Sequence, residues 1–298
     1  MKVVPLSVVA SLLCLTGAAG EQPVRPKLTG IARVRIYATN LDKSREFYAR
    51  ILGLRAGSAG CGADKTCFAV NDHQTITLVP APATPPANLL AEVAFATPDV
   101  AQMRRYLLAH GASAGNISND ADGTQHFELS DPEGHPIAFV QQPAPQPWSA
   151  PAEQVSRRMV HAGFIVRDAK LADAFYRELL GFRMYWHGGM QETDTDWLEI
   201  QVPDGQDWIE YMLNIDPKAD HDERGVMNHF ALGVTTLEPA VVRLRAHGLK
   251  SDAEPEIGRD GKWQFDIFDP DTTRVEFMEY KPAGAPCCHP YEAPHASE

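Results

Sequence analysis

Four polar residues in the second half of the chain have the types and positions that metal chemistry requires. Each lies in a short segment whose alternate positions are bulky and apolar. Because successive side chains of a strand point to opposite faces, the apolar set is expected to face a core and the polar residue the other side. Two imidazoles and two carboxylates on one face are costly unless a divalent cation compensates them. We therefore expect one metal site formed by His161, Glu210, His229 and Glu276.

The alternation can be followed in each of the four segments. In Met159–Val166, the bulky Val160, Phe164 and Val166 share one parity and are expected on the core side, whereas His161 has the other parity. The remaining three segments follow the same rule. Glu210 has the opposite parity to Ile209 and Tyr211, and Glu276 has the opposite parity to Val275 and Phe277. His229 likewise has the opposite parity to Phe230, Leu232 and Val234. Any one of these polar residues alone is typical of a solvated strand position, but four at corresponding positions indicate a site.

The chain that carries these segments repeats itself. Phe47–Leu54 recurs as Phe175–Phe182, and the turn Asp131–Gly134 recurs as Asp269–Thr272. A repeat of this length indicates two similar domains. We place the domains at residues 28–142 and 158–281, joined by a Pro- and Ala-rich linker at 143–157. A Pro-rich tail, 282–298, is expected to be disordered.

Each half divides again into two modules with one order of elements. A short strand comes first, then an amphipathic helix that ends near Gly, then three strands separated by Gly, Asp and Pro turns. In the second half we expect helices at Asp168–Leu180 and Leu237–His247, and further strands at Asp194–Val202, Gln206–Leu213 and within Trp263–Glu279. The predicted fold class is therefore α+β, with four βαβββ modules whose mixed sheets curve into cups and carry their helices outside.

This pattern resembles the vicinal oxygen chelate superfamily, which includes glyoxalases, bleomycin-resistance proteins, epimerases and extradiol dioxygenases. The residues that carry the resemblance are His161–Asp168, Phe175–Gly181, Trp208–Glu210, Asn228–Leu232 and Asp269–Phe277. The resemblance implies two tandem glyoxalase-like domains, each a pair of βαβββ modules. It also implies one divalent metal ion (Zn, Ni, Co, Mn or Fe(II)) in the C-terminal cup and a small-molecule substrate with adjacent oxygens.

The first half lacks the corresponding metal ligands. By the spacing of the repeat, Arg33 takes the place of His161, Glu92 that of His229, Ala138 that of Glu276, and Leu78 or its neighbour Thr77 that of Glu210. An Arg33–Glu92 pair would neutralise this cup without a metal, so the N-terminal half is expected to support the fold or shape the entrance. An anion-binding role for Arg33 is the alternative. In the second half, Thr272 replaces the Gly usual in such turns.

The ligand set bears on the reaction. His161, Glu210, His229 and Glu276 would give N₂O₂ coordination with two open positions, and the resemblance to glyoxalases and epimerases implies proton transfer by Glu276 or Glu210. Ring-cleaving extradiol dioxygenation is the runner-up. The stretch 259–268 contains neither His nor Tyr, which counts against it, although His221 and Tyr185 are candidates to approach the cup. The same ligand set is also compatible with a small-molecule-binding protein without catalysis and with a purely structural metal site.

Composition limits the partners. The chain has 298 residues, a formal net charge of −12 and no run of Lys and Arg, so a nucleic-acid partner is not expected. Its 44% hydrophobic content is sufficient for real cores. An apolar pocket around the metal is one interpretation of the aromatic residues Tyr185, Trp186, Trp197, Trp208 and Trp263, and ordinary core packing is the other.

The N-terminus predicts export. In residues 1–20, Lys2 precedes a short apolar run and small residues, as in a cleaved signal peptide, and the run is too short to span a bilayer. We expect a periplasmic or extracellular protein with no membrane association after cleavage. In such a compartment Cys61 and Cys67 are slightly favoured to form a disulfide. Cys287 and Cys288 stand next to His289 in the tail, where soft metal binding is an alternative to disorder.

Overall fold

A computed structural model describes residues 23–57, 61, 66–144 and 148–298 of the chain. The predicted signal peptide, residues 1–20, lies outside the described residues, as do residues 145–147 of the predicted linker. Within the part that is described, none of the helices has the length and apolar character needed to cross a bilayer.

The first half forms one mixed sheet of eight strands in the order β2-β3-β4-β1-β5-β8-β7-β6. Its two central strands, β1 and β5, are antiparallel to each other, and each also has a parallel neighbour, β4 and β8 respectively. The elements are β1 (Gly30–Ala38), α1 (Leu41–Glu46), η1 (Phe47–Ile51), β2 (Arg55–Ala56), β3 (Cys67–Ala69), β4 (Thr75–Pro80), β5 (Leu90–Ala96), α2 (Val100–Ala109), β6 (Ser118–Asn119), β7 (Gln125–Ser130) and β8 (Pro136–Gln141).

The second half repeats this topology, with the strand order β10-β11-β12-β9-β13-β16-β15-β14. One additional helix, α4, precedes β13. The elements are β9 (Arg158–Ile165), α3 (Ala169–Asp173), η2 (Ala174–Leu179), β10 (Arg183–Gly188), β11 (Trp197–Gln201), β12 (Trp208–Met212), α4 (His221–Met227), β13 (His229–Val234), α5 (Leu237–Ala246), β14 (Glu256–Ile257), β15 (Trp263–Phe268) and β16 (Arg274–Glu279).

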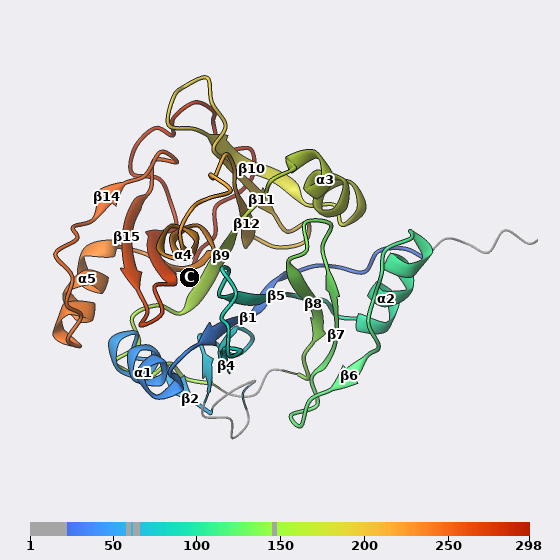
Figure 1. Cartoon of the computed structure of the whole chain (residues 1–298), viewed down its shortest axis with the longest axis horizontal. Helices are drawn as coiled ribbons and strands as arrows, with labels where there is room; N and C mark the ends of the chain where they lie inside the picture. Colours follow the sequence, from blue (N-terminus) through green and yellow to red (C-terminus); the bar gives the residue numbers. More distant parts are fainter. Residues whose placement is uncertain (1–22, 58–60, 62–65, 145–147) are drawn as a thin grey trace, which may run out of the picture.

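The prediction of an α+β fold with four βαβββ modules is confirmed. Each eight-stranded sheet contains two modules in chain order, for example β9-α3-β10-β11-β12 and β13-α5-β14-β15-β16. Figure 1 shows helices α1, α2, α3 and α5 at the periphery of the molecule, outside the two sheets. Each module supplies only part of a sheet, so two modules are needed to form one cup.

Local sequence explains where the first helix of each half begins and ends. Asn40 and Asp168 precede α1 and α3, and their side-chain oxygens accept hydrogen bonds from the backbone N–H of Lys43 and Leu171. Both helices continue into a π-helical turn, η1 or η2, and the chain then leaves through Gly53 or Gly181. The φ angles of these glycines, 69° and 80°, lie in the left-handed region that favours glycine.

The two halves share a core and exchange matching contacts. Tyr48 of the first repeated helix donates a hydrogen bond to Asp269 of the second half, and Tyr176 donates to Asp131 of the first half. The ring of Tyr176 also lies 6.4 Å from that of Phe95. Because these residues belong to the two repeated motifs, the helix of one half packs against the turn of the other. The repeats therefore position the two cups relative to each other.

A β-bulge changes one detail of the predicted alternation. His161 pairs with Ala231 and Met159 pairs with Leu232, so Val160 is the extra residue on β9. As a result Val160 does not join the core under the helices, as predicted, but packs with Trp208 and Ala231 on the side of the sheet that carries His161. Phe164, Ile209, Phe230 and Val275 lie in the main core, as the alternation predicts.

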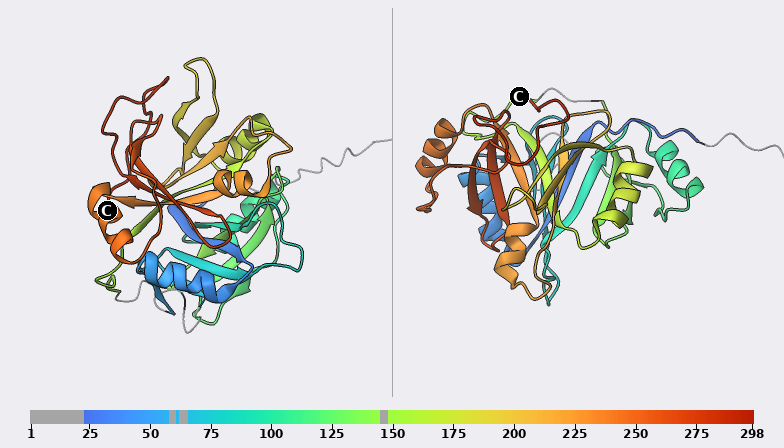
Figure 2. Two further views of the ribbon diagram at one scale, coloured as in Figure 1. Left: turned by 60° about the vertical axis from the view of Figure 1, so that its left-hand side comes forward. Right: turned by 90° about the horizontal axis from the view of Figure 1, so that it is seen from above.

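The tail that was expected to be disordered, residues 282–298, instead packs onto the C-terminal sheet. Ala296 is buried, the Gln201 side chain donates a hydrogen bond to the Pro294 carbonyl, and the Tyr185 hydroxyl lies 2.8 Å from His295 Nδ1. Figure 2 shows the tail and the loop after β10 side by side. Composition suggested disorder because the tail is rich in Pro, yet its few aromatic and small residues cover an apolar surface of the sheet.

Turns and disulfides complete the fold. Thr272, at the position where the first half has Gly134, adopts a left-handed φ of 67°, so the turn keeps its geometry without glycine. Cys61 and Cys67 form the favoured disulfide. Cys287 and Cys288 form a second one, between adjacent residues of the tail.

Candidate metal centre

Four neighbouring strands bring the predicted ligands together. His161 stands on β9, Glu210 on β12, His229 on β13 and Glu276 on β16. In the strand register, Gly163 of β9 pairs with Glu210 on one side and with His229 on the other. Ala231 of β13 likewise pairs with His161 on one side and with Glu276 on the other. All four side chains therefore lie on the concave face of one sheet, although nearly 120 residues separate the first from the last.

The donor atoms of these side chains converge. His161 Nε2 lies 3.0 Å from His229 Nε2 and 3.4 Å from Glu276 Oε2, and His229 Nε2 lies 3.2 Å from Glu210 Oε2. One donor atom each from His161, Glu210 and His229 lies within 4.8 Å of the other two, close enough to hold one ion. Glu276 is not one of these three residues but lies beside them, with its Oε2 3.5 Å from His229 Nε2.

Glycine on the central strand makes room for this cluster. A Cβ atom built on Gly163 would overlap the imidazole of His229, which crosses the strand at that point. Side chains of β12 and β13 can therefore meet above β9 only because Gly163 has no side chain. The sequence contains this signal, since Gly163 has the parity of His161 and lies on the same strand.

Electrostatics shows how tightly the groups interact. Burial is the largest influence on each of them, and it lowers the pKa of His161. Burial and Arg274 oppose protonation of His229, but hydrogen bonds that its imidazole donates to Glu210 and Glu276 raise its pKa above the ordinary value. Burial likewise favours the neutral form of Glu276, yet its contacts with His161, His229 and Arg274 hold its pKa well below the usual range. The carboxylates thus favour the charged form, which is the form that binds a metal.

The donor set fits a divalent ion. Two neutral imidazoles and two carboxylates balance a 2+ charge, and nitrogen with oxygen donors suits Fe(II), Zn, Ni, Co or Mn. His229 Nδ1 lies 3.3 Å from the Met227 carbonyl, a contact that leaves Nε2 as the free nitrogen facing the other ligands. Two imidazole nitrogens at 3.0 Å, each also facing carboxylates, require a cation or a shared proton between them.

Arg274 is a member of the centre that the sequence analysis missed. Its Nη2 lies 2.7 Å from His229 Nε2 and 3.8 Å from Glu276 Oε2, and its Nη1 donates to Asp266 at 3.2 Å. The signal was available, because Arg274 precedes Glu276 by two residues and therefore faces the same side of β16. The guanidinium balances part of the negative charge of the cup.

A polar cavity of about 370 Å³ leads to the two glutamates. Six carboxylic acids and two arginines contribute to its wall, which makes it more acidic than the apolar pocket considered from the sequence. Of the five aromatic residues proposed as lining, only Trp186 and Trp197 belong to it. The lining residues are Trp186, Met190, Trp197, Glu199, Glu210, Glu256, Ile257, Gly258, Arg259, Asp260, Gln264, Asp266, Arg274 and Glu276.

Two of the other three aromatic residues, Tyr185 and Trp208, help to enclose a buried lysine behind the cavity, whereas Trp263 packs against the main core. Lys262 Nζ lies 4.3 Å from the centre of the Trp208 ring and 4.9 Å from that of Tyr185, and Tyr291 of the tail completes the enclosure at 5.0 Å. Burial opposes the charge of Lys262, but Tyr185, Asp260 and Glu199 raise its pKa above the ordinary value. Lys262 thus places a fixed positive charge behind a wall of carboxylates.

Neither residue considered for ring cleavage lines the cavity. The hydroxyl of Tyr185 is held by His295, and its ring packs on Trp208. His221 is exposed at the first position of α4. Among the described lining residues there is no histidine or tyrosine.

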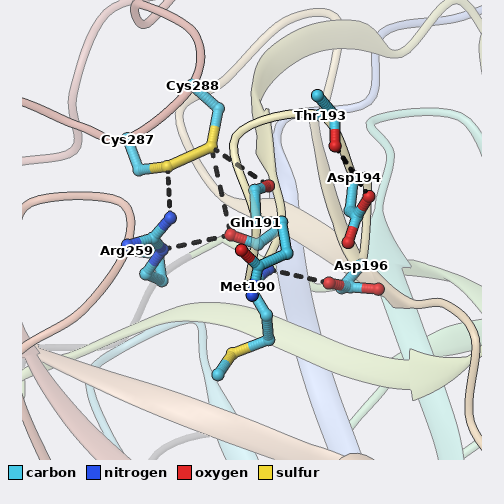
Figure 3. Close-up of a disulfide and its surroundings, with 9 residues drawn as sticks. Met190, Gln191, Thr193, Asp194, Asp196, Arg259, Cys287 and Cys288 are labelled. Atoms are coloured by element: carbon cyan, nitrogen blue, oxygen red, sulfur yellow. Dashed lines mark hydrogen bonds between the residues drawn. A yellow bond between two sulfur atoms is a disulfide. The ribbon is translucent and has the colours of Figure 1, made fainter.

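The tail disulfide lies beside Arg259, which lines the cavity (Figure 3). Arg259 donates from Nη2 to Cys287 Sγ at 2.7 Å and from Nε to the Gly189 carbonyl at 3.1 Å. Cys288 Sγ lies 3.9 Å from the carbonyl oxygens of Gly189 and Gln191. The disulfide thereby joins the tail, Arg259 and the loop after β10, and Met190 of this loop lines the cavity.

The N-terminal cup contains ion pairs in place of ligands. The register aligns Arg33 with His161, Glu92 with His229 and Ala138 with Glu276, as the repeat predicts, and it selects Thr77 rather than Leu78 as the counterpart of Glu210. Arg33 Nε donates to Glu92 at 3.0 Å, and Arg35 bridges Glu92 and Glu128. Elsewhere in the described chain, no further group of three candidate metal ligands comes together.

The family model of the Glyoxalase/Bleomycin resistance protein/Dioxygenase superfamily matches residues 30–139 and 158–277. The chain belongs to this superfamily. The resemblance stated from the sequence is thus confirmed, and family membership together with the clustered donors agrees with the prediction of one divalent metal ion. No curated protein matches the chain.

Solved structures of this superfamily are similar to the chain over most of its length. The anaerobic complex of homoprotocatechuate 2,3-dioxygenase from Brevibacterium fuscum with 3,4-dihydroxyphenylacetate is 22% identical, with a TM-score of 0.62, and the match covers 87% of this chain and 83% of that one. A room-temperature structure of an extradiol ring-cleaving dioxygenase from B. fuscum is 20% identical, with a TM-score of 0.64 and coverage of 87% and 74%. At this identity the similarity shows the fold.

Proposed function

We propose that the chain is a divalent-metal-dependent enzyme that transfers a proton on a small substrate with adjacent oxygens. The observation that carries this proposal is the pair of glutamates, Glu210 and Glu276, which face two imidazoles at the end of a cavity. His161, Glu210, His229 and Glu276 would hold the ion. Bound there, a divalent ion would supply Lewis acidity to two neighbouring substrate oxygens.

The two glutamates are restrained differently. Both glutamates face both imidazoles, but Glu276 also lies 3.8 Å from Arg274 Nη2. The side chain of Glu276 is 4% exposed and that of Glu210 is 11% exposed. The less restrained carboxylate is the one better able to turn toward a substrate. We therefore assign the proton transfer to Glu210 and the fixed-ligand role to Glu276.

Hydrogen exchange tests this assignment directly. We expect the Zn²⁺-loaded protein to exchange the carbon-bound hydrogens of an α-hydroxyketone such as dihydroxyacetone with D₂O, followed by NMR. Glu210→Gln, assayed at Zn²⁺ concentrations that restore full metal occupancy, should slow the exchange by about 10²–10⁴-fold, the usual contribution of a general base. His229→Ala should lose both metal and exchange. Metal-dependent exchange that persists unchanged in Glu210→Gln would assign the base elsewhere.

Ring-cleaving dioxygenation is the second candidate. Two observations support it: the likeness to extradiol dioxygenase structures over 87% of the chain, and the group of two histidines and one carboxylate formed by His161, His229 and Glu210. The cavity wall, which has no tyrosine or further histidine among its described residues, counts against it. Oxygen uptake with a ring-opened product, from Fe(II)-loaded protein and 4-methylcatechol, would make dioxygenation the better conclusion. Ligand binding without either turnover would indicate a binding protein.

We further propose that the protein is exported. The sequence of residues 1–20 supports this, and so do the two disulfides, Cys61–Cys67 and Cys287–Cys288, because disulfides persist in oxidising compartments. Mass spectrometry of the secreted or periplasmic protein should find an N-terminus at Glu21 and four cysteines without free thiols. A mature chain that retains Met1 and free thiols would contradict this.

A further inference from the structure

The disulfide of the tail joins two consecutive residues, Cys287 and Cys288. A disulfide stabilises a fold mainly by closing a loop of the unfolded chain, and this effect grows with the length of the loop. Consecutive residues are already joined by a peptide bond, so the disulfide between them restrains the unfolded chain very little. Other contacts hold the tail, since Tyr291 donates to the Asp260 carbonyl and Ala296 is buried. The disulfide therefore has little value as a cross-link.

This disulfide lies nearer the surface than the other one. Cys287 and Cys288 are half-buried, and the contacts of their sulfur atoms with Arg259 and with the Gln191 carbonyl are exposed. In the other disulfide, by contrast, both cysteines are buried. Thiol–disulfide exchange requires a thiolate to reach one of the two sulfur atoms. The tail disulfide is therefore the one that an external thiol can reach in the folded protein.

The two sulfur atoms have opposite electrostatic surroundings (Figure 3). Arg259 Nη2 donates to Cys287 Sγ at 2.7 Å. Cys288 Sγ instead lies 3.9 Å from the carbonyl oxygens of Gly189 and Gln191. A guanidinium stabilises a thiolate, whereas the partial negative charge of a carbonyl oxygen opposes one. Negative charge is therefore more stable on the sulfur of Cys287 than on that of Cys288.

Backbone contacts hold Arg259 against Cys287. The N–H of Cys287 donates to the Arg259 carbonyl at 2.7 Å, and Arg259 Nε donates to the Gly189 carbonyl at 3.1 Å. The acid that follows Arg259 in the chain, Asp260, pairs with Lys262 instead. The guanidinium therefore stays beside Cys287 with its charge available to that sulfur atom.

We propose that Cys287–Cys288 is a redox-active disulfide that exchanges with an external dithiol. A thiolate of the dithiol attacks Cys288 Sγ, the bond between the two cysteine sulfurs breaks, and Cys287 departs as a thiolate beside Arg259. The second thiol of the reductant then attacks its own sulfur in the mixed disulfide and releases Cys288. In balance, the dithiol loses two electrons and two protons and becomes a disulfide, and the two cysteines gain them as thiols. The exchange involves no metal ion.

Reduction of the full chain in its folded state tests the exchange. The protein is treated with dithiothreitol at pH 7, with EDTA present to remove metal, then blocked with iodoacetamide, and peptide mass spectrometry follows each cysteine. We expect Cys287–Cys288 to open at least about ten-fold faster than the buried Cys61–Cys67, which is the internal control. Opening of the tail disulfide only after unfolding in urea would overturn the proposal.

A second reductant distinguishes the source of the dithiol. Reduced thioredoxin presents a dithiol on a protein surface, whereas dithiothreitol is a small molecule. Opening by both supports exchange with a protein dithiol, and opening by dithiothreitol alone supports exchange with a small dithiol. Opening by neither in the folded chain would overturn the proposal.

Variants of Arg259 test the role of its charge. Arg259→Gln should slow the opening by at least about three-fold, because a less stable thiolate departs more slowly. Arg259→Lys keeps the charge and should restore most of the rate. Arg105→Gln, at an exposed position of α2 in the other half, is the matched control and should open like the wild type. An unchanged rate in Arg259→Gln would overturn the assignment of Cys287 as the departing sulfur.

Single-cysteine variants compare the two sulfur atoms directly. Cys288→Ser retains the thiol beside Arg259, and Cys287→Ser retains the one beside the carbonyl oxygens. At pH 7, iodoacetamide should alkylate Cys287 in the first variant at least about three-fold faster than Cys288 in the second, because the thiolate is the reactive form. Urea unfolding of both variants checks that the fold is kept. Equal rates, or faster alkylation of Cys288, would contradict the proposed order of attack.

Discussion

At the scale of single residues, the candidate centre depends on direct ligands and on the space around them. His229 contacts His161, Glu210, Glu276 and Arg274, so it is the residue with most contacts in the cluster. We expect His229→Ala and Glu276→Gln to weaken metal binding by at least about 100-fold. Loss of a residue that only hydrogen-bonds to a metal ligand already lowers metal affinity about 10–100-fold. Metal analysis after dialysis against a weak chelator measures this.

Arg33→Ala is the matched control for that experiment, because Arg33 occupies the place of His161 in the N-terminal cup. It should leave the metal content unchanged while destabilising the protein, since the buried Glu92 keeps only Arg35 as a partner. Full metal occupancy in His229→Ala would mean that the ligands have been assigned wrongly. Metal loss in Arg33→Ala would mean that both cups contribute to one site.

Gly163 supplies a second test at the same scale. A methyl group at Gly163 would meet the His229 imidazole, so we expect Gly163→Ala to lower the free energy of unfolding by about 1–3 kcal/mol, the usual cost of overpacking, and to weaken metal binding. Gly284→Ala is the control, because a Cβ there meets no atom within 4 Å and its φ is not positive. Urea unfolding and metal titration of both variants give the comparison. Wild-type metal affinity in Gly163→Ala would show that His229 has room to move.

At the scale of elements, the tail is part of the C-terminal domain. Residues 282–298 cover Tyr185, Trp208 and Lys262, and Tyr291 donates to Asp260 at both its carbonyl and its carboxylate. We expect a chain truncated after Lys281 to lose several kcal/mol of stability, on the order of 3 kcal/mol or more, because it exposes large aromatic surfaces and a buried charge.

Two measurements check the role of the tail. Urea unfolding gives the change in stability, and acrylamide quenching should increase as Trp208 becomes accessible. Cys287→Ser/Cys288→Ser is the comparison variant, since it removes the disulfide beside Arg259 but keeps Tyr291 and Ala296 in the chain. Unchanged stability and quenching in the truncated chain would show that the packing of the tail contributes nothing.

At the scale of the whole molecule, Asp269, which accepts a hydrogen bond from Tyr48 of the other half, links stability to pH. Burial raises the pKa of Asp269 from 3.8 to about 6, outweighing its hydrogen bonds with Asp271, Thr273 and Tyr48. A folded-state pKa above the unfolded one means that the folded protein binds the proton more tightly. The contribution of Asp269 to the free energy of unfolding is therefore fully present below pH 3.8, and it is lost as the pH rises through about 6.

The expected size of this effect is about 3 kcal/mol, the free-energy equivalent of the shift in pKa. Comparison with Asp269→Asn isolates it: the stability of the wild type relative to the variant should fall between pH 4 and pH 7. Urea unfolding at each pH measures both proteins, with the exposed Asp252→Asn as the control. A wild-type-minus-variant difference that stays constant across this range would contradict the assignment.

How far the sequence predicts these features depends on whether their causes are local. The alternation of apolar residues on β12, β13 and β16 acts within a few residues, and the repeated motifs recur in the chain. They were sufficient for the fold class and for identifying the four candidate ligands. The bulge at Val160 was not predictable in this way, because a bulge depends on how two distant strands pair.

The sequence by itself determined the four modules. It also determined that the C-terminal cup carries histidines and glutamates and that the N-terminal cup carries Arg33 and Glu92. Both results follow from the alternation of side chains along a strand and from the internal repeat, which are properties of the chain. Only the tertiary structure decided what surrounds the ligands. Arg274, Glu199 and the tail reach the centre through strand register and through contacts between distant segments. Their charges and contacts are what give the cavity its acidic wall, since the electrostatic environment of a site depends on which groups are close in space.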